Sequence, residues 1–153
     1  MDPLSVTASI LAVVGATKGV VKGIAKLRSL QKAPVELSSL MNEVSDLRAV
    51  LTQVASFGNQ LEEERLRGPV VALKSHLARA TEQIQALDHM VNNELMKIHA
   101  NGTVKLGRRA WLRLKPKFHD MQVELRNSRV NISTMLGVVT SYVLEMCVVY
   151  GNS

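Results

Sequence analysis

The placement of four prolines constrains the fold more than any other feature of the chain. Pro3, Pro34, Pro69 and Pro116 each stand just before a long segment, and no proline interrupts one of these segments. A proline at the first position of a helix costs little, because its missing N–H would have no partner there. Asp2 adds an acidic N-cap candidate before Pro3. The prolines therefore predict four helix starts.

The apolar residues that follow the prolines have helical spacing. Steps of three and four place them on one stripe of a helix, and no stretch alternates with period two for long enough to predict a strand. The stripes of the second, third and fourth segments are formed by Leu37, Leu40, Met41, Val44, Leu47, Leu51 and Val54; by Leu73, Leu77, Ala80, Ile84, Leu87, Val91, Leu95 and Ile98; and by Phe118, Met121, Leu125, Ile132, Met135, Val139, Val143 and Met146.

These observations predict an all-α protein. We expect a single domain over residues 1–153, a bundle of four helices, with five as the alternative. The helices are predicted over 3–31, 35–57, 69–100 and 116–149. A chain of 153 residues is long enough to bury a hydrophobic core without disulfides or metal ions to stabilise it.

The charge of the chain is unevenly distributed. The net charge is +4 over residues 1–33, −3 over 34–100, +6 over 101–129 and −1 over 130–153, which gives +6 in total. A basic chain predicts an anionic partner, either nucleic acid or a lipid surface. The presence of one cysteine excludes a disulfide framework within the chain and indicates a reducing, intracellular setting.

The first predicted helix begins with an uncharged half, residues 3–17. Fifteen residues span roughly 22 Å as a helix, less than the roughly 30 Å hydrocarbon core, so a transmembrane helix is not predicted. Asp2 takes the place of the basic residues that open a signal peptide. An interfacial or membrane-inserting helix fits better. The candidate inserting residues are Leu4, Ile10, Leu11, Val13 and Val14.

Small residues and lysines repeat every four positions in the same helix. Gly15, Gly19 and Gly23 predict a groove along which another helix can approach closely. A stripe of candidate lipid-headgroup ligands runs beside them, formed by Lys18, Lys22 and Lys26. The alternative is that the apolar residues of this helix are simply core, with glycines where helices cross.

Six cations surround the only tryptophan, Trp111. Cations beside an indole are typical of a membrane interface, and we expect Pro116 to end this short helix before Lys117. The candidate headgroup ligands are Lys105, Arg108, Arg109, Trp111 and Arg113. Phosphates of nucleic acid could bind the same cations, but 3% aromatic residues leave little for base stacking. The remaining alternative is a solvated basic loop with Trp111 in the core.

No catalytic constellation is visible in the sequence. The four histidines form no metal-binding spacing, and there is neither a phosphate-binding loop nor a nucleophile elbow. Cys147 lies in an apolar run and is predicted to be an inert core thiol. We expect no enzyme, no catalytic residue, no cofactor and no metal.

Five stretches of the chain resemble the N-terminal domain of fungal NOD-like (STAND) receptor proteins. They are residues 1–10 (MDPLSVTASI), 33–37 (APVEL), 42–51 (NEVSDLRAVL), 109–113 (RAWLR) and 125–132 (LRNSRVNI). This group is similar to the HeLo and HeLo-like domains, helical bundles of proteins that act in programmed cell death and heterokaryon incompatibility.

The resemblance implies a membrane-targeting effector or signalling domain. Its hydrophobic N-terminal helix, here residues 4–26, would be held in the bundle at rest and released to insert into membranes after oligomerisation. The implied partners are anionic membrane lipid, further copies of the chain on activation, and a receptor or partner helix, with no nucleic acid. The implied location is the cytoplasm, with movement to the inner face of the plasma membrane. An adaptor bundle that binds only proteins is the alternative.

Overall fold

The computed structural model describes residues 6–30, 33–57 and 67–151. Its elements are α1 (Val6–Arg28), α2 (Val35–Ser56), α3 (Arg67–His89), the π-helical turn η3 (Met90–Leu95), the strands β1 (Met96–Ile98) and β2 (Val104–Leu106), and α4 (Arg108–Gly151). The all-α bundle predicted from the sequence is confirmed.

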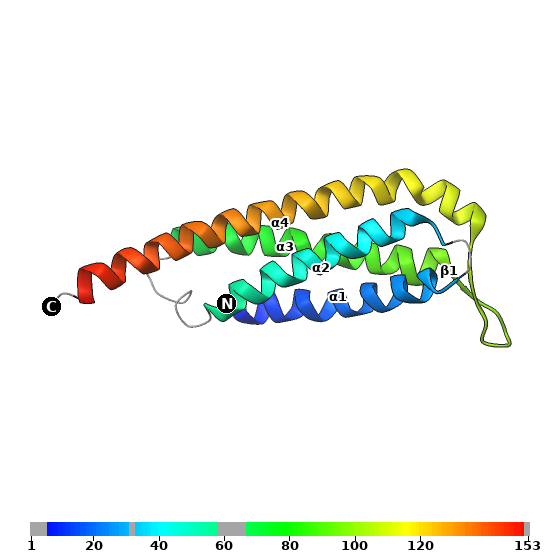
Figure 1. The fold of residues 1–153 in the computed structure, drawn as a ribbon, viewed down its shortest axis with the longest axis horizontal. Coiled ribbons are helices and arrows are strands. Elements are labelled where there is room, and N and C mark those ends of the chain that lie inside the picture. The colour runs from blue at the N-terminus through cyan, green and yellow to red at the C-terminus, as the bar shows by residue number, and fades with distance from the viewer. Residues whose placement is uncertain (1–5, 31–32, 58–66, 152–153) are drawn as a thin grey trace.

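The four helices form an elongated bundle (Figure 1). α1 packs against α2 and α3, and α4 packs against the same two helices, so α1 and α4 lie at opposite corners. α4 is the longest element, with 44 residues, and its C-terminal end extends past the other helices (Figure 1). The small hairpin of β1 and β2 projects from the opposite end of the bundle (Figure 1).

One core runs along the bundle and is built largely from the predicted stripes, but Ile98 of the third stripe lies in β1 and is 68% exposed. Ile84, in the middle of the α3 stripe, is fully buried, and so are Leu47 on α2 and Ile24 on α1. Leu125 and Ile132 continue the core on α4. Because each helix buries one stripe, the apolar spacing accounts for which face of each helix points inward.

The third helix is shorter than predicted. α3 ends at His89 and η3 at Leu95, and the chain then forms an antiparallel hairpin in which Lys97 pairs with Lys105. Gly102 turns the hairpin with a φ of 80°, and its N–H donates to the His99 carbonyl at 2.9 Å. The prediction that the chain has no strand is therefore wrong, although the Asn-Gly turn (residues 101–102) is a strong hairpin signal.

The fourth helix is longer than predicted. α4 begins at Arg108, where the N–H of Trp111 donates to the Gly107 carbonyl at 2.8 Å, and it continues through Pro116. Pro116 is exposed, and so is Leu112, whose carbonyl loses its usual helical donor because proline has no N–H. The prediction that Pro116 starts a helix, and ends one before Lys117, is therefore wrong.

Candidate functional site

The predicted inserting residues of α1 mostly face the core. Ile10 and Val13 have no exposed surface and Val14 is half-buried, whereas Leu11 is 61% exposed. Leu4 lies outside the described residues. In this structure α1 is a core helix, so its apolar face would reach lipid only after the helix leaves the bundle.

Two of the three glycines of α1 allow a close approach within the chain itself. A Cβ atom added to Gly23 would lie 2.6 Å from the Asn92 amide oxygen, and one added to Gly19 would lie 2.9 Å from an Asp88 carboxylate oxygen. Asn92 donates to Asp88 at 2.8 Å. A Cβ atom on Gly15 would meet nothing within 4 Å. The predicted groove is therefore occupied by α3 and η3 at Gly19 and Gly23, and it does not extend to Gly15.

The lysine stripe of α1 lies on the outer surface. Lys18, Lys22 and Lys26 are all exposed, and none of them forms an ion pair within the part of the chain that the structure describes. α1 ends at the same end of the bundle as the hairpin (Figure 1). Lys26, in the last turn of α1, therefore adds to the positive charge of that end.

Trp111 is part of the core and not of a lipid interface. Its side chain is 9% exposed, and its ring centroid lies 5.6 Å from that of Phe118 at an interplanar angle of 40°. The indole is thus held in place by aromatic packing. The assignment of Trp111 as a headgroup ligand is corrected: the alternative reading of a core tryptophan is right, although the segment around it is helix and not loop.

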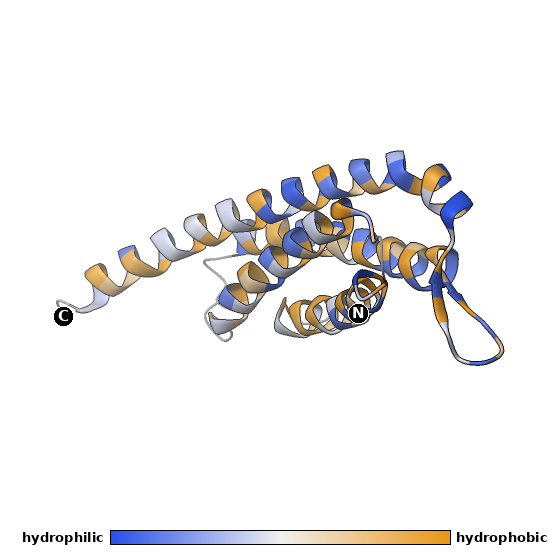
Figure 2. Cartoon of the chain, turned by 45° about the vertical axis from the view of Figure 1, so that its right-hand side comes forward, coloured by the Kyte–Doolittle hydropathy of each residue, from blue (hydrophilic) through white to orange (hydrophobic). Residues whose placement is uncertain are grey.

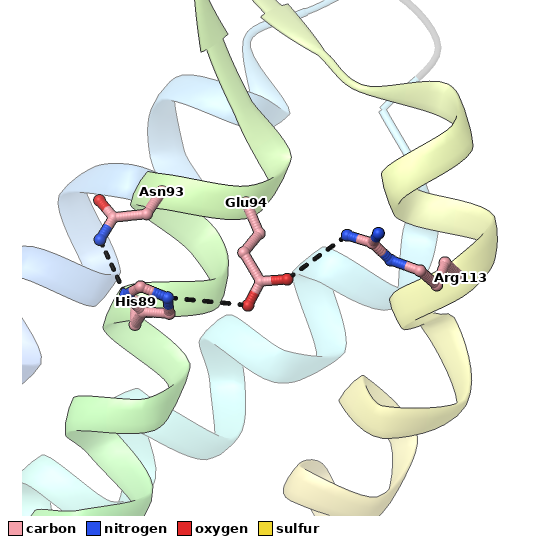
Figure 3. A network of polar contacts seen from close by, with 4 residues as sticks. All are labelled: His89, Asn93, Glu94 and Arg113. Carbon is pink, nitrogen blue, oxygen red and sulfur yellow. Dashed lines mark hydrogen bonds and ion pairs between the residues drawn. The ribbon is translucent and has the colours of Figure 1, made fainter.

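Arg113 faces a carboxylate of η3. Its guanidinium lies 3.6 Å from Glu94, and the other oxygen of this carboxylate lies 3.9 Å from Nε2 of His89 (Figure 3). Nδ1 of the same ring lies 2.8 Å from the Asn93 amide (Figure 3). Arg113 thus ties the start of α4 to η3, and its charge is partly balanced.

The other predicted cations gather at the hairpin end of the bundle. Lys105, Arg108 and Arg109 are exposed, and so is Lys97, which stands directly opposite Lys105 in the hairpin. None of the four forms an ion pair with any residue that the structure describes. Like charges that face each other across a strand pair are destabilising. We call these four residues the cationic end.

An apolar cleft of about 460 Å³ lies between the start of α2 and the first turns of α4. Leu37, Trp111 and Phe118 line it, and an ion pair of 2.7 Å between Lys115 and Glu36 lies at its edge. The hydrogen bond that Lys115 donates lowers the pKa of the Glu36 carboxyl, and a backbone hydrogen bond acts in the same direction. The cleft thus combines aromatic walls with one balanced charge pair.

Polar side chains in the middle of α4 contact polar side chains of α2 and α3, and the sequence analysis did not predict this group. Glu43 of α2 is only 7% exposed, and it pairs with Arg126 at 2.8 Å and faces Arg129 at 3.6 Å. Ser128 donates to Gln83 of α3 at 2.7 Å. We call these five residues the polar clamp. The sequence features that could have predicted it are an acidic residue, Glu43, beside the α2 stripe and two arginines three residues apart on the fourth segment.

Beyond the polar clamp, the apolar surface of α4 is largely open. An 18-residue window of this helix has a mean hydropathy of 1.7 and is 11% buried, so the helix is long and apolar enough to cross a membrane by length and composition. α1 passes the same test with 33% of its window buried. Core helices and signal sequences pass this test too. The exposed apolar residues of this part of α4 include Val138, Tyr142, Leu144, Val148 and Val149.

Cys147 lies in this open part of α4 and is exposed, so the prediction of a core thiol is wrong. The error has a simple origin: residues 143–150 are apolar except for Glu145, but the neighbouring helices end before this part of α4. Among the described residues, no group of three or more His, Cys, Asp or Glu side chains could hold a metal ion. The sequence-based prediction that the chain is not an enzyme stays a prediction.

The fold and these surfaces define a basic, all-α helical bundle with one overhanging helix. Residues 1–140 match the family described as pigment biosynthesis cluster protein PigL N-terminal, so the chain belongs to this fungal-associated family. No curated protein and no solved structure matches the chain. The matched residues end directly after Val139, the last buried residue of α4 that the structure describes.

Proposed function

We propose that the chain is a membrane-associating effector or signalling domain of the HeLo-like, cell-death kind. The cationic end is the observation that carries this proposal. Lys97 and Lys105 are held side by side at a cost to the hairpin, with Arg108 and Arg109 next to them and no described acid to balance the four. An anionic lipid surface would offset this repulsion, since each cation near such a surface contributes about 1 kcal/mol.

In this proposal α1 is held in the bundle at rest and released after oligomerisation. Its buried residues include Ile10, Val13 and Ile24, which have no exposed surface. Exposing a fully buried aliphatic side chain costs about 1.5–3 kcal/mol. Spontaneous release would therefore be rare, and clustering on a membrane would supply the driving force. The close approach of Gly19 and Gly23 to α3 and η3 supports the idea of a closed resting state.

An adaptor bundle without membrane activity is the second candidate. The cleft between α2 and α4 favours it, because an open apolar cleft of about 460 Å³ could accept side chains of a partner helix. In this account the cationic end would bind an acidic protein surface, and vesicles would not be bound.

Sedimentation with lipid vesicles tests the proposed function. We expect binding to vesicles that contain phosphatidylglycerol, weak binding to pure phosphatidylcholine, and loss of binding as salt screens the charges. The double variant Lys105→Glu/Arg109→Glu should bind at least tenfold more weakly. Its matched control is Lys74→Glu/Arg79→Glu on α3, which changes the net charge equally at a distance from the hairpin.

Three results would overturn the proposal. Equal loss of binding in the two double variants would mean that only the net charge matters. Equal binding to neutral and anionic vesicles would remove the electrostatic basis. Salt-dependent binding to nucleic acid, with none to lipid, would place the chain in a different functional class.

A further inference from the structure

The last twelve residues of α4 that the structure describes contribute no fully buried side chain, although Val143 still packs against the edge of the core. Val139 is the last buried residue, and within residues 140–151 all side chains are exposed or half-buried. Figure 1 shows this part of the helix extending past the ends of α1, α2 and α3. We call residues 140–151 the apolar overhang.

The apolar overhang has apolar side chains on every side of the helix, and Glu145 is its one charged residue. Residues 146–150 (MCVVY) are five consecutive apolar positions, and at 100° per residue they point to every side of a helix. Leu144 and Val148 are 60% and 67% exposed. A helix that docks on another helix needs only one apolar stripe, whereas a helix surrounded by hydrocarbon is apolar on all sides. The pattern therefore favours lipid over a single partner helix.

Hydroxyl groups along this part of α4 are satisfied by the helix itself. Thr140 donates to the Leu136 carbonyl at 2.8 Å, and Ser141 donates to the Gly137 carbonyl at 3.0 Å. About two turns earlier, Thr134 donates in the same way to the Val130 carbonyl at 2.9 Å. Such bonds to the preceding turn remove the need for water at these side chains. The segment is therefore less polar than its composition indicates.

Charge is almost absent from this region. Glu145 is the one charged residue between positions 130 and 151, whereas the polar clamp lies directly before it. The hydropathy colours follow the same division: hydrophilic residues are frequent in the first half of α4 and sparse towards its C-terminal end (Figure 2). The clamp would hold the bundle in water while the following residues face an apolar medium.

We propose that the apolar overhang enters the hydrocarbon region of a lipid bilayer. This inference rests on the proposed function and names the segment that contacts the lipid interior. Twelve helical residues measure about 18 Å, and a helix that lies along the bilayer buries its apolar surface about 5–10 Å deep, at the boundary between headgroups and acyl chains. The overhang and the cationic end lie at opposite ends of α4, so a molecule that lies lengthwise on the bilayer presents both to it.

The native Cys147 allows a direct test, because it is exposed and lies within the overhang. We would attach a bimane fluorophore to it in the full chain and add vesicles of phosphatidylcholine with one quarter phosphatidylglycerol. Insertion predicts a blue shift of the emission and quenching by lipids that carry a nitroxide on the acyl chain. An emission unchanged at saturating lipid, in protein that does sediment with the vesicles, would overturn the inference.

A pair of variants separates the overhang from the bundle. Leu144→Lys/Val148→Lys places two charges in the overhang, at exposed positions that the fold tolerates, and should weaken vesicle binding at least tenfold. The matched control is Val71→Lys/Leu112→Lys, two apolar residues of the bundle that are 62% and 72% exposed. Because added lysines attract anionic lipid, a loss confined to the overhang variant cannot come from charge alone.

The outcomes distinguish the inference from the proposed function. If the wild-type protein binds vesicles and both lysine variants bind as well as it does, the overhang is not the inserting segment, and the proposed function stands. If the wild-type protein binds no vesicle, both fail. If the overhang variant instead converts a lipid-free oligomer into a monomer, the overhang meets a second copy of the chain and the lipid assignment is wrong.

Discussion

Among the described residues, α1 and the C-terminal half of α4 are the two segments long and apolar enough to cross a membrane by length and composition, and they differ in how far the bundle buries them. A third of the α1 window is buried, against 11% of the α4 window. The apolar face of α1 lies against α2 and α3, whereas α4 extends past the ends of these helices as the apolar overhang. Hydropathy identifies segments that could meet lipid, but packing decides which of them is available without unfolding.

The two segments need different changes in the fold before they can contact lipid. For α1 to enter a membrane, the core must open and fully buried residues such as Ile10 and Val13 must leave it. For the overhang, the resting fold already exposes Leu144 and Val148. On these grounds the overhang would make the first apolar contact with lipid, and insertion of α1 would be a later, triggered step.

The largest expected effect is the difference in stability between a variant with a charge in α1 and a variant with a charge in the overhang. Val13→Lys puts an unpaired ammonium in the core and should lower the free energy of unfolding by at least about 3 kcal/mol, as for other unpaired buried charges. Val148→Lys changes an exposed residue and should stay within about 0.5 kcal/mol of the wild type. Thermal unfolding followed by circular dichroism measures both. Equal melting temperatures for the two variants would mean that α1 is not sealed in the core.

Alanine substitutions at two glycines of α1 test the packing of this helix in the core, with smaller expected changes in stability. Gly23→Ala should destabilise the bundle by about 1–3 kcal/mol, because its Cβ would overlap Val91 at 2.8 Å as well as Asn92. Gly15→Ala adds a Cβ in open space and should stabilise α1 by about 0.5–1 kcal/mol. Urea unfolding of the two variants gives these values. A Gly23→Ala variant as stable as Gly15→Ala would contradict the close packing of α1 on η3.

The smallest expected effect concerns the start of α4, far from the overhang. Lys115 lowers the pKa of Glu36, so the pair stabilises the fold above the ordinary pKa of this carboxyl and loses its contribution as the pH falls through the lowered value. Lys115→Met should remove this contribution, which is less than about 1 kcal/mol for an exposed pair. Stability curves between neutral and acid pH should therefore converge at low pH. Curves that stay parallel would show that the pair contributes nothing.

The sequence predicted the class of fold because the apolar spacing is local information. The α3 stripe from Leu73 to Leu87 is buried as expected, and Pro34 does precede the start of α2. Pro116 gave a wrong helix boundary, because a proline on an exposed helix face destabilises the helix less than one whose neighbours are buried. The hairpin was missed since three-residue strands are too short for an alternating pattern, although its Asn-Gly turn (residues 101–102) was visible.

The candidate site was less predictable, because it depends on which residues meet across the bundle. The exposure of Lys105, Arg108 and Arg109 agrees with the sequence analysis. The burial of Trp111 and the exposure of Cys147 do not, since they follow from where neighbouring helices begin and end. Helix length relative to its neighbours is tertiary information, and the apolar spacing of a single helix does not contain it.

The central claim is that the overhang, and not α1, first contacts the lipid interior, and a paired label tests it most directly. One sample carries a bimane on native Cys147, and the other carries it on Leu11→Cys in a Cys147→Ser background, at a large apolar residue of α1 that is 61% exposed. On anionic vesicles we expect quenching by acyl-chain nitroxides at position 147 and little at position 11. Strong quenching at position 11 with none at 147 would contradict the account.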